Sequence, residues 1–280
     1  VSLLASTMRM MIPLILAGLG GAVSGKAGVI NFALEGYMLV GAFAGAVGSY
    51  LTGNPMIGLL LAIVAGALAG LLMSIFVSVF KGAHVVISVG FNFVASGLTA
   101  LILSTMFGTS GVSPRVNKLT LYKLPIVGEQ TIIFIIAILS VPILCWTLWK
   151  TVFGLRLRAV GENRSAADSV GIDVVKYQII ALVISGILAG LAGAELSIGQ
   201  IAFFGKDMTG GKGFLGVAGA RIGGYNPIVG FFMRLSGLFK VPGQLLLTIP
   251  YLVTIFATLG FRRFKAPSAL GVQYDREKNI

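Results

Sequence analysis

Long runs of apolar residues without a single charge recur along this chain and limit what it can fold into. A helix needs roughly 20 apolar residues to cross the hydrocarbon core of a bilayer, and both Met56–Phe80 and Thr131–Trp149 reach that length. Charged residues make up only 11% of the chain, against about 25% in ordinary soluble domains. The sequence therefore predicts an all-α fold, a polytopic transmembrane helical bundle.

The apolar runs and the connectors between them predict about seven to nine crossings. The other runs are Leu3–Val23, Ile30–Tyr50, Val85–Phe107, Ile179–Ile198 and Leu245–Phe261. Two segments, Phe214–Gly224 and Ile228–Phe239, are too short to cross alone. We expect a short broken or re-entrant pair near 214–239, because irregular backbone is tolerated in a membrane only where protein or water shields it. Residues 1–280 are interpreted as a single integral-membrane domain.

Basic residues lie in the short connectors and in the tail rather than on one face. The net charge of +12 is therefore attributed to topology, because cytoplasmic loops are enriched in Lys and Arg, and not to a nucleic-acid partner. This places the polar loop 150–178 and the tail 262–280 in the cytoplasm. Gly108–Gln130 is then an external loop, although its own net positive charge disagrees with that orientation.

The loop 150–178 is the one long polar stretch in the middle of the chain. Asn163 or Ser165 can cap a helix N-terminus, and Ala166–Val170 is predicted to form a short helix that Gly171 ends. Such a helix has little apolar surface to bury, so we expect a partner rather than this chain to hold it. The alternative interpretation is an ordinary charged loop that only sets topology.

Polar residues inside the apolar runs are the candidates for a translocation path, because they are costly at membrane depth and usually face a cavity or a partner. They are Asn31, Glu35, Asn92, Glu195 and Gln200. Asn31 and Glu35 are four residues apart and so share one helical face. Two interpretations stay open for each of them: contact with a substrate, or structural pairing with backbone or a basic neighbour.

No residue constellation predicts catalysis, so the chain is not expected to be an enzyme. Gly20–Ala27 contains GxxxxGK, but alanine stands where a phosphate-binding loop needs Ser or Thr, and no strand precedes it. Gly211–Gly216 fits GxGxxG without a strand before it. The single His84 predicts no metal site, and the single Cys145 excludes an intrachain disulfide.

Four stretches of the sequence carry a family resemblance: Ala27–Leu72, Gly154–Ile172, Ser185–Gln200 and Ile249–Tyr274. Together they resemble the integral-membrane permease of bacterial ABC importers, in the branch that carries ribose-type sugars and nucleosides. The closest likeness is to the shorter permease subunit of nucleoside (guanosine-type) uptake systems, and the resemblance extends over nearly the whole chain.

The resemblance implies a multi-pass permease in a bacterial cell membrane that takes up nucleosides or, alternatively, ribose-like sugars. It implies three partners: an ABC ATPase subunit, a second permease in a heterodimer, and an extracellular or periplasmic substrate-binding protein or lipoprotein. No cofactor is expected in this chain, since ATP and magnesium would bind the ATPase. The loop resembles the family's coupling-helix region, and the candidate coupling residues are Gly154, Arg158, Gly161, Glu162, Asn163, Ala166, Ala167 and Gly171.

The chain departs from the family pattern after Gly223–Gly230. The family usually has a longer apolar segment there, whereas this chain has ten residues that include Arg234, and Arg221 stands where an aliphatic residue is more usual. One crossing is therefore expected to be shortened. A rival from another class is an ion-coupled secondary transporter, since such carriers use glycine-interrupted helices like those expected at 199–240.

Overall fold

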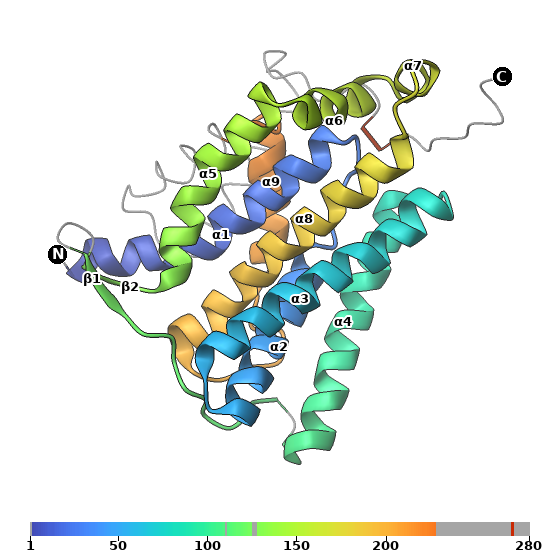
Figure 1. Cartoon of the computed structure of the whole chain (residues 1–280). Helices are drawn as coiled ribbons and strands as arrows, with labels where there is room; N and C mark the ends of the chain where they lie inside the picture. Colours follow the sequence, from blue (N-terminus) through green and yellow to red (C-terminus); the bar gives the residue numbers. More distant parts are fainter. Residues whose placement is uncertain (1, 110, 125–127, 228–269, 272–280) are drawn as a thin grey trace.

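The computed structural model describes residues 2–109, 111–124, 128–227 and 270–271, and helices dominate this part of the chain (Figure 1). They are α1 (Ser2–Lys26), α2 (Leu34–Thr52), α3 (Pro55–Ser74), α4 (His84–Phe107), α5 (Ile132–Lys150), α6 (Val152–Glu162), α7 (Arg164–Ser169), α8 (Val174–Ala194) and α9 (Lys212–Ile222). Two π-helical turns, η1 (Ile75–Val79) and η2 (Glu195–Ile201), extend α3 and α8. One antiparallel hairpin joins β1 (Tyr122–Leu124) to β2 (Gly128–Gln130).

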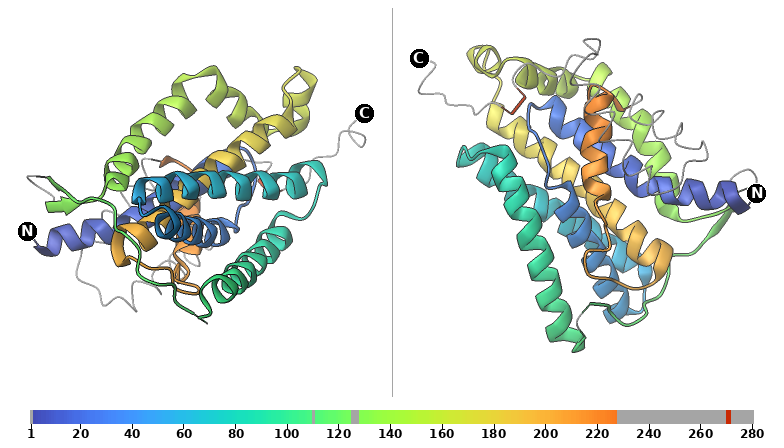
Figure 2. Two further views of the ribbon diagram at one scale, coloured as in Figure 1. Left: turned by 60° about the horizontal axis from the view of Figure 1, so that its bottom comes forward. Right: turned by 180° about the vertical axis from the view of Figure 1, so that it is seen from behind.

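The long helices pass between two ends of the molecule (Figures 1 and 2). The α6 end carries α6, α7 and the turns that follow α1 and α3. The hairpin end carries β1, β2 and the turn between α2 and α3. The predicted all-α, polytopic membrane fold is confirmed, because five stretches are long and apolar enough to cross a membrane: Met8–Lys26, Pro55–Val79, His84–Phe107, Ile132–Lys150 and Val174–Ile201.

α2 differs from its prediction. The sequence predicts a span over Ile30–Tyr50, whereas the helix begins at Leu34, and it is not among the five most membrane-like stretches. Its glycines, serine and glutamate lower its hydropathy. α2 packs against α3, α8 and α4, and most of its residues are buried. A helix covered by other helices does not need an apolar surface toward lipid.

Three other elements differ from the sequence-based prediction. The region 108–130, predicted as a plain loop, contains the β1–β2 hairpin. The region 150–178, predicted to hold one short helix, holds α6 as well as α7. α8 begins at Val174 rather than Ile179, because the Asp173 carboxylate accepts a hydrogen bond from the Lys176 backbone N–H and caps it. The runs predicted at Ile228–Phe239 and Leu245–Phe261, and all of the tail except Leu270 and Gly271, lie outside the described residues.

Glycines let α2, α3 and α8 pack backbone to backbone. A methyl group at Gly193 of α8 would overlap the Met38 carbonyl oxygen of α2, and one at Gly66 of α3 would overlap the Gly186 carbonyl oxygen of α8. Small residues allow this close approach, which replaces the hydrophobic driving force that helices lack in lipid. The three helices form the centre of the bundle.

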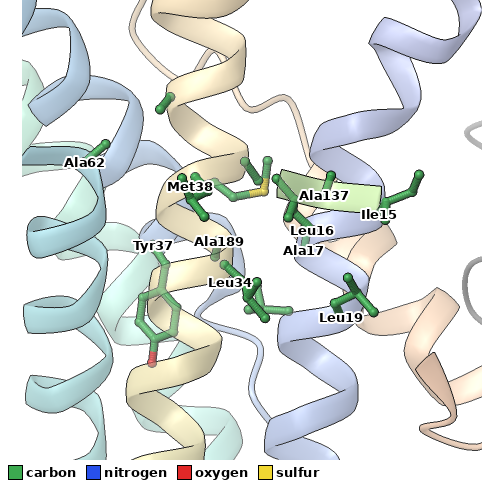
Figure 3. Packing of buried hydrophobic residues seen from close by; sticks show 14 of the residues in the cluster. Ile15, Leu16, Ala17, Leu19, Leu34, Tyr37, Met38, Ala62, Ala137 and Ala189 are labelled. Atoms are coloured by element: carbon green, nitrogen blue, oxygen red, sulfur yellow. The ribbon is translucent and has the colours of Figure 1, made fainter. Parts of the chain in front are cut away.

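Apolar side chains fill the space between this centre and α1 (Figure 3). Leu16 and Ala17 of α1 face Leu34 and Met38 of α2, and all four side chains are fully buried. By contrast, α4 exposes most of its surface, including Phe93 and Val94. The outer faces of α3, α4 and α5 are therefore the apolar surface available to lipid or to other subunits.

Two elements at the core of the bundle do not cross it as complete helices. Residues 27–33, between α1 and α2, are non-helical and largely buried. α9 has 11 residues, about 16 Å of helix, and packs along the half of α1 that leads to the α6 end. α9 matches the short segment predicted over Phe214–Gly224, while Ile228–Phe239, the other half of the predicted pair, lies outside the described residues.

Candidate functional site: the α6–α7 segment and two polar junctions

Local capping signals shape the α6–α7 segment. The Thr151 hydroxyl accepts a hydrogen bond from the Gly154 N–H at the start of α6, 3.2 Å away. The Asn163 side chain accepts one from the Ala166 N–H at 3.1 Å and so separates α6 from α7. Gly171 has a φ of +82°, which favours glycine. The predicted cap at Asn163 and the predicted turn at Gly171 are confirmed.

α7 is held by this chain, which corrects the expectation that only a partner would hold it. Ala167 is buried in a small cluster with Val160 and Val174. The Arg164 guanidinium is buried as well, and donates a hydrogen bond to the Gly28 carbonyl oxygen at 2.8 Å. The rest of α7 stays exposed, with the Val170 side chain 73% exposed just beyond it. The segment is thus anchored on one side and open on the other.

The eight candidate coupling residues divide in the same way. Gly154 and Gly161 lie in close contacts, since a methyl group at either position would overlap backbone of α5 or the Lys26 carbonyl oxygen. Arg158 lies over the Trp149 ring, 4.4 Å from its centre. Ala167 is buried. The exposed ones, which can face another protein, are Glu162, Asn163, Ala166 and Gly171.

Arg164 was not among the residues singled out from the sequence. Burial lowers the pKa of its guanidinium to about 10, so the side chain remains protonated at neutral pH. A buried cation needs hydrogen-bond acceptors to offset its lost hydration. The Gly28 acceptor is 136 positions away in the sequence, so no local pattern signals this contact.

Two asparagines fix the start of α2, and with Ser185 we call them the central junction. The Asn31 amide donates to the Ser185 hydroxyl oxygen of α8 at 3.1 Å and accepts from the Ala33 N–H at 3.1 Å. The Asn92 amide of α4 accepts from the Gly36 N–H at 2.8 Å and donates to the Phe32 carbonyl oxygen at 3.0 Å. These bonds satisfy backbone groups that the break before α2 would leave unpaired.

Glu35 joins the central junction to α9. One of its carboxylate oxygens accepts from the Gly211 N–H at 2.8 Å, and the other accepts from the Gly213 N–H at 2.6 Å. A carboxylate at a helix N-terminus satisfies free N–H groups and meets the positive end of the helix dipole. The sequence left open whether Glu35 contacts a substrate or pairs with backbone or a basic neighbour. In this conformation it pairs with the backbone N–H groups at the start of α9.

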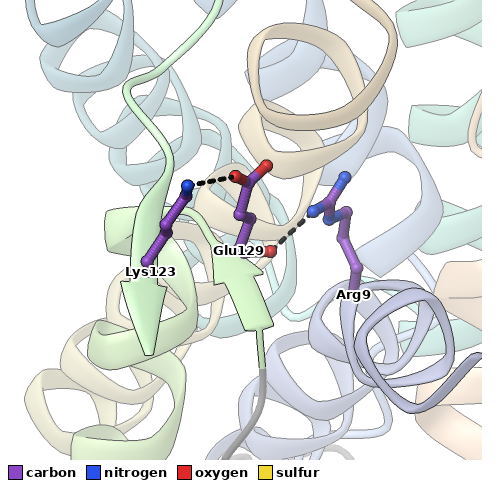
Figure 4. Close-up of polar contacts among 3 residues, drawn as sticks. All are labelled: Arg9, Lys123 and Glu129. Atoms are coloured by element: carbon purple, nitrogen blue, oxygen red, sulfur yellow. Dashed lines mark hydrogen bonds and ion pairs between the residues drawn. The ribbon is translucent and has the colours of Figure 1, made fainter. Parts of the chain in front are cut away.

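A second polar group lies at the hairpin end, and we call it the far-end cluster. The buried Glu195 carboxylate of η2 accepts a hydrogen bond from the Thr131 hydroxyl at 2.6 Å. The Gln200 amide donates to the Arg9 carbonyl oxygen at 3.0 Å. The Arg9 guanidinium in turn donates to the Glu129 carbonyl oxygen at 2.6 Å (Figure 4). These bonds tie α1, β2, α5 and η2 together.

The five candidate path residues are therefore divided between two places. Asn31, Glu35 and Asn92 meet around the start of α2, whereas Glu195 and Gln200 lie in the far-end cluster. Neither Arg9 nor Thr131 was among the candidate residues predicted from the sequence. A charge within an apolar run is the signal that points to Arg9, but nothing local points to Thr131.

Replacing Thr131 with valine is expected to destabilise the protein, because it removes the hydroxyl that hydrogen-bonds a fully buried carboxylate. The expected loss is about 1–3 kcal/mol, measured as a lower melting temperature of the purified protein. Thr147→Val is the matched control, since the exposed Thr147 hydroxyl bonds only the Ile143 carbonyl oxygen of its own helix. Equal melting temperatures for the two variants would contradict this role of Thr131.

Comparison with known proteins identifies the family. The family model described as "Branched-chain amino acid transport system / permease component" matches residues 3–256. The guanosine ABC transporter permease protein NupQ of Bacillus subtilis is 33% identical over an alignment that covers 95% of this chain and 94% of NupQ. That alignment has 299 positions, more than the chain has residues, so NupQ carries residues that this chain lacks.

Two further relatives are also permease proteins of ABC transporters. The nucleoside ABC transporter permease protein NupC of Lactococcus lactis is 31% identical, with 95% of this chain and 94% of NupC covered. The guanosine ABC transporter permease protein NupP of Bacillus subtilis is 32% identical, with 80% of this chain and 68% of NupP covered. No solved structure matches this chain. The chain thus belongs to the family of transport-system permease components that this model describes.

Proposed function

We propose that this chain is the membrane-spanning permease subunit of an ATP-driven importer of nucleosides. The observation that carries the proposal is the likeness over nearly the whole length to NupQ and NupC, whose names specify guanosine and nucleosides. The five apolar helices that are long enough to cross a membrane support a multi-pass protein of the bacterial cell membrane. The chain itself moves the substrate and leaves ATP hydrolysis to a partner.

The exposed side of the α6–α7 segment is the proposed docking surface for the ATPase. It combines apolar side chains with the exposed candidate coupling residues, and Val152, Leu155 and Val170 are each more than half exposed. The anchored side of the same segment contacts the end of α1. A displacement imposed by the ATPase would therefore reach the bundle. In this proposal the α6 end faces the cytoplasm.

A second permease and a substrate-binding protein complete the proposed importer. Bacillus subtilis has two permeases that are similar to this chain, NupP and NupQ, both named for guanosine, which supports a heterodimer here. The substrate path is proposed to run through this dimer. Among the candidates for it, Glu35 and Asn92 hold the two half-crossing elements in place, and Glu195 and Gln200 lie nearer the hairpin end.

Uptake of labelled guanosine tests the proposal, in cells that express this chain together with its genomic neighbours. The expected result is uptake that stops on ATP depletion and is competed by unlabelled nucleosides but not by ribose. Competition by ribose alone would overturn the nucleoside assignment in favour of a simple sugar. Uptake that survives ATP depletion and stops with a protonophore would replace the importer by an ion-coupled carrier.

Replacing Glu162 or Gly171 with alanine is expected to uncouple transport from ATP hydrolysis while the permease stays folded. Glu162 is the exposed last residue of α6, and Gly171 holds a turn with a φ that disfavours side chains. Uptake per ATP hydrolysed is the measurement, and it should fall about tenfold, equivalent to about 1.4 kcal/mol of coupling. Lys176→Ala, an exposed change on the first turn of α8, is the control. Normal coupling in both variants would contradict this assignment.

A further inference from the structure

The Gly28 carbonyl oxygen connects parts of the chain that are far apart in sequence. It accepts a hydrogen bond from the Arg164 guanidinium at 2.8 Å and another from the Gly271 backbone N–H at 2.9 Å. A carbonyl oxygen has two lone pairs, so both are used. Gly28 has a φ of +80° and is the second residue after the end of α1 at Lys26. The turn after α1 is thus held by directed bonds to α7 and to the tail.

α6 is fastened to the same turn by close packing. A methyl group at Gly161 would overlap the Lys26 carbonyl oxygen, and the next nearest atoms are Lys26 carbonyl carbon and Gly28 nitrogen. Because these contacts are made by backbone, neither side can give way by a side-chain rotation. The α6–α7 segment and the Lys26–Gly28 turn therefore move as one piece.

The other end of the non-helical segment 27–33 is bonded to three other helices. Asn31 bonds Ser185 of α8, and Asn92 of α4 bonds Phe32 and Gly36. Just beyond, Glu35 caps α9. Between Gly28 and Glu35 there are only seven steps along the chain, and the segment has no internal helical hydrogen bonds that would resist bending. Its few backbone dihedrals can therefore change, as at a hinge, while the bonds at its two ends carry the displacement on.

We propose that the segment 27–33 transmits movements of the α6–α7 segment to the central junction, and that Arg164 is the positioning residue that fastens it. This inference rests on the proposed function, because it takes the ATPase as the source of the movement. When α7 moves, Arg164 pulls the Gly28 turn with it. The segment then shifts Asn31 and the start of α2 against α4 and α9, and so changes the polar bonds of the central junction.

Arg164→Met tests the proposal in the complete importer reconstituted in vesicles with its partner subunits. Methionine keeps an unbranched apolar stem but removes every donor. The expected result is ATP hydrolysis near the wild-type rate with at least a tenfold loss of guanosine uptake per ATP, and a partial recovery in Arg164→Lys. Wild-type coupling in Arg164→Met overturns the inference.

A second measurement follows the transmission directly and separates it from a merely structural role. The backbone amides of Ala33 and Gly36 are bonded to Asn31 and Asn92 side chains, so their hydrogen exchange reports on the central junction. Trapping the ATPase with a non-hydrolysable ATP analogue is expected to change this exchange in the wild type and not in Arg164→Met. An unchanged wild-type exchange overturns the inference.

Asn92→Asp extends the test to the opposite end of the segment and covers the case in which Arg164→Met does not assemble. Aspartate keeps the acceptor for Gly36 but loses the donor to Phe32. The same uncoupling is expected, and the double variant should lose no more coupling than either single variant, because both act on one element. Additive losses overturn the inference. A wild type without ATP-dependent uptake would instead refute the proposed function itself.

Discussion

Replacing Gly193 with leucine is expected to prevent the bundle from assembling. Position 193 lies where α8 crosses α2, and even a methyl group there would overlap the Met38 carbonyl oxygen and crowd the Ala42 nitrogen. These atoms belong to the backbone of a buried helix, so they cannot move aside without separating α2 from α8. Overpacking of a close contact costs about 3 kcal/mol at the upper end of its usual range, and this site has no flexible neighbour to reduce that cost.

Gly97→Leu on α4 is the matched control, because a Cβ at position 97 meets no atom within 4 Å in the described part of the chain. The measurement is the yield of monodisperse protein in detergent and its melting temperature. We expect Gly97→Leu to behave like the wild type and Gly193→Leu to give little folded protein. Comparable losses in the two variants would show that leucine is harmful in any membrane helix here and would contradict the close-packing argument.

The membrane fold could be predicted because apolar length is a local property of the sequence. A membrane crossing needs about 20 apolar residues, and the predicted bounds of α4, of α5 and of α3 together with η1 agree with the structure to within a few residues. The start of α2 could not be predicted in this way. Val29, Ile30, Phe32 and Ala33 are as apolar as a membrane helix, and the break is held by tertiary bonds from Asn92 of α4.

The candidate site could be predicted only in part for the same reason. Asn31, Glu35 and Asn92 were singled out because polar side chains at membrane depth need a partner. Their partners could not be predicted from the sequence, because Asn92 bonds a residue 56 positions away and Glu35 bonds one 178 positions away. α6 was missed because its arginines make it resemble a loop, although Arg158 lies over the Trp149 ring and Leu157 is buried.

Replacing Glu35 with alanine is expected to release the start of α9. The carboxylate accepts from the Gly211 and Gly213 N–H groups at 2.8 and 2.6 Å, and without it both N–H groups lose their acceptor. Each lost bond to a charged group costs about 1.5–3 kcal/mol. Glu35→Gln keeps one acceptor oxygen without the charge and should lie between alanine and the wild type.

Asn54→Ala is the control for this prediction, because Asn54 caps α3 through one bond to the Met56 N–H at an exposed position. Loss of such an exposed cap costs about 1 kcal/mol. Melting temperature, together with hydrogen exchange of the peptide that contains Gly211 and Gly213, is the measurement. Glu35→Ala should exchange faster there and melt lower than Asn54→Ala. If the two variants melt alike and the exchange at α9 is unchanged, Glu35 does not hold α9, and its carboxylate becomes available for a direct role toward the substrate.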